Sequence, residues 1–383
     1  MTAHRSRMLL GALSALAFTV AVGVAGYVQS NSVSALQFST NTLVAGDGPR
    51  SIAIGDFNRD GAQDLAVANL SSDQVSIFLG DNTGSFGPAS NVAVGAGPHQ
   101  IVRGDFNQDG LDDLVTADKD GNDISVLLGD GQGGFGPAQR FTTGKGSRGV
   151  AIEDFSRDGN QDLAVVNSGT GTLPGEVQIL WGDSAGGFDT AETIEVGFFP
   201  IPVAVADLNG DGASDLVVGS RDSHRLSVLL ANGKSGAFSV ASDLAVGAGP
   251  VSIAVGDFNG DDHPDLAVAN QLGDTVAVLL GDGLGGFGEA FTSYRVGEQP
   301  KAVAVGDLDG DGNQDLAVVN SNSGTTTVLL GNGRGGFSVA LQLSVGLGPH
   351  AVAIGDFNGD GKPDLAVANR GSDDISVLIN QRP

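Results

Sequence analysis

The chain has 383 residues, of which 40% are hydrophobic, 61 are glycine and 13 are proline. Its formal net charge of −26 excludes nucleic acid as an expected partner, because phosphate backbones would repel the chain. The absence of cysteine excludes disulfides and thiolate metal sites, and the glycine content favours short strands and tight turns over long helices.

The first 28 residues resemble a signal peptide. His4, Arg5 and Arg7 precede an apolar run from Met8 to Val28, which ends in small residues. An uncleaved anchor is the alternative, because the run is long enough to cross a bilayer. No later segment is both long and apolar enough to do so. The sequence therefore predicts a secreted, periplasmic or cell-surface protein that is not inserted in the membrane after cleavage of residues 1–28.

A sequence signature that spans residues 55–67 in its first copy then repeats along the chain. Its first aspartate recurs at Asp56, Asp105, Asp154, Asp207, Asp257, Asp307 and Asp356. The intervals between these aspartates are 49, 49, 53, 50, 50 and 49 residues. Four short segments of the first period are expected to be strands, at residues 51–55, 65–68, 75–79 and 91–94. Four antiparallel strands in a unit of this length are typical of a propeller blade.

The two ends of the repeat region are expected to complete one blade. In the middle repeats the fourth strand is predicted to begin at a phenylalanine in a glycine-rich turn, namely Phe86, Phe135, Phe188, Phe238, Phe287 and Phe337. The last repeat stops at Asn380 without that strand, and the segment from Phe38 to Ala45 has the spacing to replace it. The sequence thus predicts an all-β, seven-bladed β-propeller over residues 36–380, with four antiparallel strands per blade and the last blade closed by the N-terminal strand.

Each repeat carries an aspartate-rich loop with the spacing of calcium ligands. In the first copy, Asp56, Asn58, Asp60 and Asp64 stand at positions one, three, five and nine, and Gly61 at position six permits a sharp turn. Three carboxylates in one turn repel one another unless a cation neutralises them. Mg²⁺ is less favoured, because it keeps its waters. Aspartates that serve only to form turns are the alternative interpretation.

The same positions recur in the other six copies. The expected ligands there are Asp105, Asn107, Asp109 and Asp113; Asp154, Ser156, Asp158 and Asp162; Asp207, Asn209, Asp211 and Asp215; Asp257, Asn259, Asp261 and Asp265; Asp307, Asp309, Asp311 and Asp315; and Asp356, Asn358, Asp360 and Asp364. We therefore expect up to seven Ca²⁺ ions. Two copies depart from the pattern, with Ser156 at position three and Asp262 in place of glycine at position six, and we expect these two sites to be the weakest.

Stretches such as residues 86–88, 95–98 and 104–110 (Phe-Gly-Pro, Gly-Ala-Gly-Pro and Gly-Asp-Phe-Asn-Gln-Asp-Gly) resemble FG-GAP repeats, also called VCBS repeats. Such repeats build the propellers of integrin α-subunits and of many bacterial secreted proteins. The resemblance covers residues 36–380 and implies a seven-bladed propeller with Ca²⁺ in the loop between the first and second strands of a blade. It does not define the ligand, because the same scaffold serves adhesion, carbohydrate binding and accessory roles.

The sequence favours a non-catalytic binding or adhesion module whose partner is an unidentified protein or glycan. A propeller lectin is the second hypothesis, although Trp181 and two tyrosines offer few rings for sugar stacking. A polysaccharide-active enzyme is the third, and the sequence has no nucleophile elbow and no zinc motif to support it. The oligomeric state stays open.

The partner is expected on the face opposite the aspartate loops. The basic residues and histidines predicted there are Arg50, Lys119, Lys145, Arg148, Arg221, Arg225, Lys301, Arg370, His99, His224 and His350. Ordinary solvated loop residues are the alternative interpretation for each of them. The third repeat is four residues longer than the others between Asn167 and Val177, and the next turn of this face carries two adjacent phenylalanines. The predicted partner-binding residues are Phe198, Phe199, Thr172, Leu173 and Arg148.

Overall fold

Runs of valine, alanine, leucine and isoleucine alternate with turns rich in glycine, aspartate and asparagine, and within the described part of the chain this pattern folds into 28 strands. The structure is a computed structural model that describes residues 36–232, 236–288 and 291–382. The predicted signal peptide at residues 1–28 lies outside the described residues. Within them, no helix has the length and apolar character needed to cross a membrane.

Each repeat contributes strands of four kinds, numbered here from the axis outward. The first strands are β2 (Pro49–Gly55), β6 (Pro98–Gly104), β10 (Ser147–Glu153), β14 (Pro200–Ala206), β18 (Pro250–Gly256), β22 (Pro300–Gly306) and β26 (Pro349–Gly355). The second strands are β3 (Asp64–Asn69), β7 (Asp113–Asp118), β11 (Asp162–Asn167), β15 (Asp215–Ser220), β19 (Asp265–Asn270), β23 (Asp315–Asn320) and β27 (Asp364–Asn369). The third strands are β4 (Gln74–Phe78), β8 (Asp123–Leu127), β12 (Glu176–Gly182), β16 (Arg225–Ala231), β20 (Thr275–Leu279), β24 (Thr325–Gly331) and β28 (Asp374–Asn380). The fourth strands are β5 (Ser90–Ala93), β9 (Gln139–Thr142), β13 (Phe188–Glu195), β17 (Phe238–Ala245), β21 (Thr292–Arg295), β25 (Phe337–Ser344) and β1 (Phe38–Val44).

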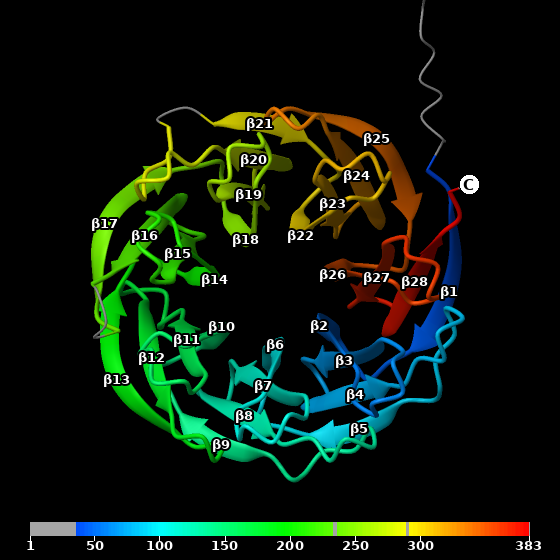
Figure 1. Cartoon of the computed structure of the whole chain (residues 1–383), viewed down its shortest axis with the longest axis horizontal. Coiled ribbons are helices and arrows are strands. Elements are labelled where there is room, and N and C mark those ends of the chain that lie inside the picture. Colours follow the sequence, from blue (N-terminus) through cyan, green and yellow to red (C-terminus); the bar gives the residue numbers. More distant parts are fainter. Residues whose placement is uncertain (1–35, 233–235, 289–290, 383) are drawn as a thin grey trace, which may run out of the picture. The chain divides into compact units, whose positions relative to one another are not determined.

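These strands form seven antiparallel sheets of four strands, which are the blades of a β-propeller. Figure 1 shows the blades around a central axis, with the first strands innermost and the fourth strands on the rim. Blades one to six follow chain order from β2–β5 to β22–β25, and blade seven combines β26, β27 and β28 with β1. In that blade β1 pairs with β28 from Phe38 opposite Asn380 to Val44 opposite Asp374. The predicted fold class and its closure by the N-terminal strand are confirmed.

The core lies between the blades. All six residues of β3 are buried, because each second strand is covered by a neighbouring blade on both faces, and this explains the apolar run of its four central residues. Phenylalanines join neighbouring blades at the rim of this core. The Phe57 ring of blade one meets the Phe135 ring of blade two edge to face, with centroids 5.5 Å apart, and Phe357 and Phe86 join blades seven and one in the same way at 5.7 Å.

The predicted start of the fourth strand is correct in only some blades. In blades three, four and six the strand does begin at the phenylalanine of the glycine-rich turn, at Phe188, Phe238 and Phe337. In blades one, two and five the corresponding phenylalanine forms an isolated bridge, as Phe86 does with Gly80, and the strand starts later. Glycine follows each of these three phenylalanines and interrupts the ladder, whereas aspartate or serine follows the phenylalanines that begin a strand.

Candidate functional site

The aspartate loops join the first and second strands of each blade, so they share one face, which we call the loop face. In blade one, the amide of Asp60 donates to Asp56 Oδ1 at 3.0 Å and to Asn58 Oδ1 at 3.1 Å. Gly61 has a φ of 85° and its amide donates to Asp56 Oδ2 at 3.0 Å. The loop therefore makes the sharp turn that its spacing predicts, with glycine at the left-handed position.

The aspartate at position nine has a structural role that sequence reasoning missed. Asp64 is fully buried, and its two carboxylate oxygens accept hydrogen bonds from the amides of Phe57 and Gly80, both at 2.8 Å. It thus ties the loop to the backbone just beyond the end of the third strand of the same blade. Burial and the nearby Asp60 and Asp56 carboxylates raise the pKa of Asp64 to about 6. Each oxygen keeps a second lone pair that a cation could use.

The sixth loop brings three carboxylate side chains close together. Within the described ranges, Asp307, Asp309 and Asp315 are the one group of three acidic side chains whose ligand oxygens all lie within 4.8 Å of one another. This is the copy with aspartate at position three, where the others have asparagine or serine. Burial raises the pKa of Asp315 to about 6, and burial with the adjacent Asp311 and Asp307 raises the pKa of Asp309. A cluster of this kind could hold a metal ion, whereas calcium in this loop and in the other six stays a prediction.

The loops of blades three and five, whose sequences depart from the common pattern, also differ from the other loops in structure. In blade three the amide of Ser156, instead of that of Phe155, donates to the position-nine Asp162 at 2.9 Å, and the Ser156 hydroxyl donates to Asp154 at 3.4 Å. In blade five Asp262 takes the left-handed conformation, with a φ of 64°, at the position where the other loops have glycine. A hydroxyl is a weaker ligand than an amide or carboxylate oxygen, and a left-handed aspartate strains the turn.

We therefore expect the third and fifth loops to lose calcium first when free calcium is lowered. Amide chemical shifts of Gly159 and Asp262, followed during a chelator titration, measure this directly. If the signals of Gly61 or Gly110 in the first and second loops changed at higher free calcium than those two, ligand quality would not set the order of affinity.

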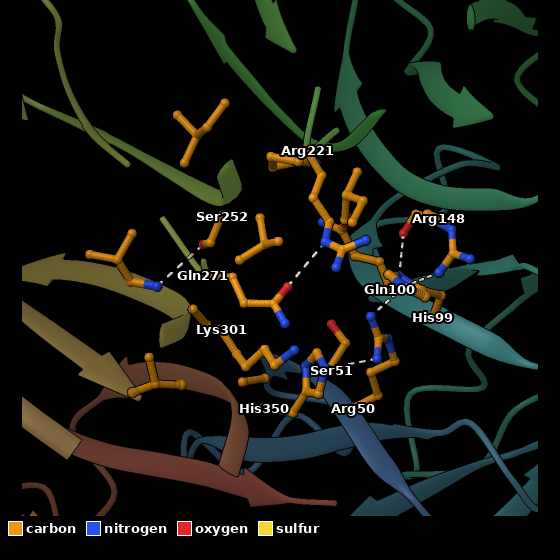
Figure 2. A pocket seen from close by; sticks show the side chains of 18 of the residues that line it. Arg50, Ser51, His99, Gln100, Arg148, Arg221, Ser252, Gln271, Lys301 and His350 are labelled. Carbon is orange, nitrogen blue, oxygen red and sulfur yellow. Dashed lines mark hydrogen bonds between the residues drawn. The ribbon is translucent and has the colours of Figure 1, made fainter. Parts of the chain in front are cut away.

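The opposite ends of the first strands surround a cavity of about 380 Å³ on the propeller axis, which we call the axial pocket. Seven lining residues stand at the second position of a first strand, namely Arg50, His99, Arg148, Ile201, Val251, Lys301 and His350. Three more follow the second strands, namely Arg221, Gln271 and Arg370. Figure 2 shows Arg50, Arg221, Lys301 and His350 pointing into this space from different blades. Lys119, Lys145, Arg225 and His224, also predicted on this face, lie outside the lining.

Arg50 is at the centre of a hydrogen-bond network in the axial pocket. Its Nη1 donates to His350 Nε2 at 2.8 Å, and its Nη2 donates to His99 Nε2 (Figure 2). His99 Nδ1 in turn donates to the carbonyl of Arg148 at 2.8 Å, which makes Nε2 the acceptor and the imidazole neutral. Burial and the adjacent arginines hold the pKa of His99 well below its usual value, and burial with Arg50 does the same for His350.

Two of the predicted partner-binding residues meet at this pocket. The guanidinium of Arg148 lies 4.5 Å from the centre of the Phe199 ring, and that of Arg221 lies 5.5 Å from it. Phe198 is 43% exposed and Leu173 is 66% exposed, and both lie outside the pocket lining, as does the exposed Thr172. A hydrogen bond of 3.1 Å from the Gly175 amide to the Gly197 carbonyl joins the two turns that carry these residues. The irregular turns are therefore neighbours, as predicted, but only Phe199 and Arg148 contribute to the cavity.

Comparison with known proteins agrees with this architecture. The profile of the FG-GAP-like repeat matches residues 56–116, 105–165, 154–218, 207–268, 257–318 and 307–367. No curated protein matches the chain. Among solved structures, the chain is similar to BBS1N in complex with ARL6DN, with 17% identity over 91% of this chain and 97% of that one and a TM-score of 0.63.

Two bacterial structures are also similar. A protein from Lactobacillus plantarum shares 16% identity over 80% of this chain and 87% of that one, with a TM-score of 0.63. A periplasmic gluconolactonase from Pseudomonas aeruginosa shares 16% identity over 79% of this chain and 87% of that one, with a TM-score of 0.61. At these identities the likeness concerns the fold alone.

Proposed function

The chain belongs to the family of FG-GAP-like repeat proteins, and from this membership we propose that it is an exported, calcium-binding propeller that acts as a non-catalytic binding module. The protein would be secreted or held at the cell surface, with a protein or glycan as partner. Its loop face would bind up to seven Ca²⁺ ions, and its opposite face would bind the partner.

The observation that carries the calcium part of this proposal is the sixth loop. Three acidic side chains, Asp307, Asp309 and Asp315, bring their oxygens within 4.8 Å of one another there, and the charge of Arg382 opposes the rise in the pKa of Asp309 without cancelling it. The raised pKa values of Asp309 and Asp315 indicate that the protein compensates these two carboxylates incompletely, and a hard divalent cation would supply that compensation. The position-nine aspartates of all seven loops have raised pKa values for the same reason, namely burial.

A binding role is favoured over catalysis by the chemistry of the axial pocket. The described lining contains no aspartate or glutamate that could pair with a histidine as acid and base. His99 and His350 both accept hydrogen bonds from Arg50, so their free lone pairs are already in use. Arginines anchored in this way hold a ligand more readily than they transform one.

Equilibrium dialysis with radioactive calcium tests the proposal. The chelated protein is expected to take up as many as seven ions and to prefer calcium over magnesium. Asp309→Ala removes the position-three ligand of the sixth loop and should lower the number of bound ions by one. Asp189→Ala is the matched control, because Asp189 is an exposed strand residue outside every loop and its loss changes the net charge equally. A folded protein that binds no calcium at millimolar concentration would disprove the proposal.

A further inference from the structure

We propose that the axial pocket binds a small anion carrying two or more acidic oxygen groups, such as a dicarboxylate or a sulfate. The inference rests on the proposed binding role and adds the chemical class of the ligand. It is independent of the calcium loops, which lie at the other end of the first strands.

The axial pocket is rich in positive charge. Five cationic side chains line the axial pocket and come from five blades, namely Arg50, Arg148, Arg221, Lys301 and Arg370. The described lining contains no acidic residue, although the chain as a whole has a net charge of −26. Just outside the lining, Asp222 pairs with Arg221 at 3.2 Å and Asp120 acts on Arg148, and an adjoining cavity that shares Lys301, His350 and Arg370 is also lined by Asp47 and Asp373. The pocket is therefore a local positive field in an acidic protein, and such a field concentrates anions.

The cations also repel one another. Burial together with Arg50, Arg221 and Arg370 lowers the pKa of Lys301 to about 8. Burial and the charges of Arg148 and Arg370 lower the pKa of Arg50 to about 9. Cationic side chains that are held close together despite their mutual repulsion are typical of a site that is completed by a ligand of opposite charge.

Arg50 also has unused hydrogen-bonding capacity in the axial pocket. Arg50 Nε is buried and has no hydrogen-bond partner. Its two Nη atoms donate only to neutral imidazoles, so the guanidinium meets no negative charge through these bonds. A buried donor without an acceptor costs free energy, and the planar fork of a guanidinium matches the oxygens of a carboxylate or a sulfate.

The size and lining of the axial pocket fit a small ligand. The cavity of about 380 Å³ lies within the range of pockets that hold small molecules. Ile201, Val251 and the Phe199 ring give part of its wall an apolar surface, and Arg50 and Lys301 contribute charge from blades one and six. A short ligand with acidic ends and an apolar middle would contact the cationic side chains with its ends and the apolar part of the wall with its middle.

Isothermal titration calorimetry with the whole protein tests this inference, with succinate and sulfate as probes because both bind Ca²⁺ weakly. At least one of them is expected to bind with a Kd of about 1 mM or tighter, while acetate and chloride at equal ionic strength do not. Succinate alone would assign a carboxylate ligand, sulfate alone a tetrahedral anion, and binding of both the shared oxyanion chemistry.

Lys301→Gln and Arg50→Gln are each expected to weaken that binding at least about tenfold, because each removes one charge from the pocket. Lys145→Gln makes the same chemical change as Lys301→Gln at an exposed residue of this face outside the lining, and it should bind like the wild type. If neither probe bound to a folded protein that takes up calcium normally, the anion site would be refuted and the calcium proposal would stand. Equal affinities in Lys301→Gln, Arg50→Gln and the wild type would also refute it.

Discussion

Replacing Asp118 with asparagine is expected to raise the free energy of unfolding by on the order of 4 kcal/mol at pH 8 and to leave it nearly unchanged at pH 4. Asp118 ends the second strand of blade two and is fully buried. Burial, opposed by hydrogen bonds from Ser125 and Thr116, raises its pKa to about 7. The charged groups nearest to it are Asp123, which adds to the rise, and Arg140, which opposes it.

The direction of this pH dependence follows from the protonation of the Asp118 carboxyl in the folded and in the unfolded chain. Below pH 4, Asp118 is protonated in both the folded and the unfolded chain and contributes nothing to pH dependence. Between pH 4 and pH 7 the unfolded chain loses this proton while the folded chain keeps it, so the stability of the wild type falls by about 1.4 kcal/mol per pH unit. Above pH 7 this loss of stability stays constant. The Asp118→Asn variant carries no charge at this position, so its stability does not fall in this way.

The other blades provide the control for this prediction. The residues equivalent to Asp118 are Asn69, Asn167, Ser220, Asn270, Asn320 and Asn369, all buried and uncharged. Asn69→Asp should therefore lower the stability of blade one at pH 8 and have little effect at pH 4. Urea unfolding of the wild type and both variants at the two pH values measures these differences. Equal stability of Asp118→Asn and the wild type at pH 8 would mean that the buried charge is compensated.

The fold was predictable because its determinants are local and repeated. The spacing of Asp56, Asn58, Asp60 and Gly61 defines a turn by short-range hydrogen bonds, and seven copies in phase leave little freedom for the strands between them. The missing fourth strand of the last repeat could be matched to Phe38–Val44 because a propeller must pair both of its ends.

The axial pocket was only partly predictable, because it depends on side chains that meet across the ring. Arg50, His99 and His350 were expected on the correct face, but nothing local indicates that their side chains converge. One signal was available. All three stand directly after the proline that begins a first strand, and Lys301 does too, so an alignment of the repeats would have placed them in one ring around the axis.

The role of the position-nine aspartates was missed for a related reason. The spacing alone predicts that a carboxylate at that position is a metal ligand. The amides that Asp64 accepts from belong to residues 7 positions before it and 16 positions after it, and the second distance is set by the pairing of the second and third strands. Such a contact follows from strand register and not from the loop sequence.

A chain that begins after residue 45 is expected to lose at least about 5 kcal/mol of unfolding free energy, or to fail to fold. Without β1, the strand β28 becomes an exposed edge with seven unpaired residues. Leu36 and Phe38 pack against the core between blades six and seven, and Leu43 packs against the core between blades seven and one. The deletion therefore weakens two blade interfaces at once, and thermal unfolding measures the loss.

A synthetic peptide of residues 34–46 makes the test specific. If β1 acts by closing the ring, the peptide added in excess should bind the shortened chain and restore much of its unfolding temperature, because β28 offers the same ladder to a separate strand. A peptide in which Phe38 and Leu43 are both replaced by serine keeps the backbone ladder but loses the packing, and it should restore less. A shortened chain as stable as one beginning at residue 34 would show that the propeller holds together without the strand that joins its two ends.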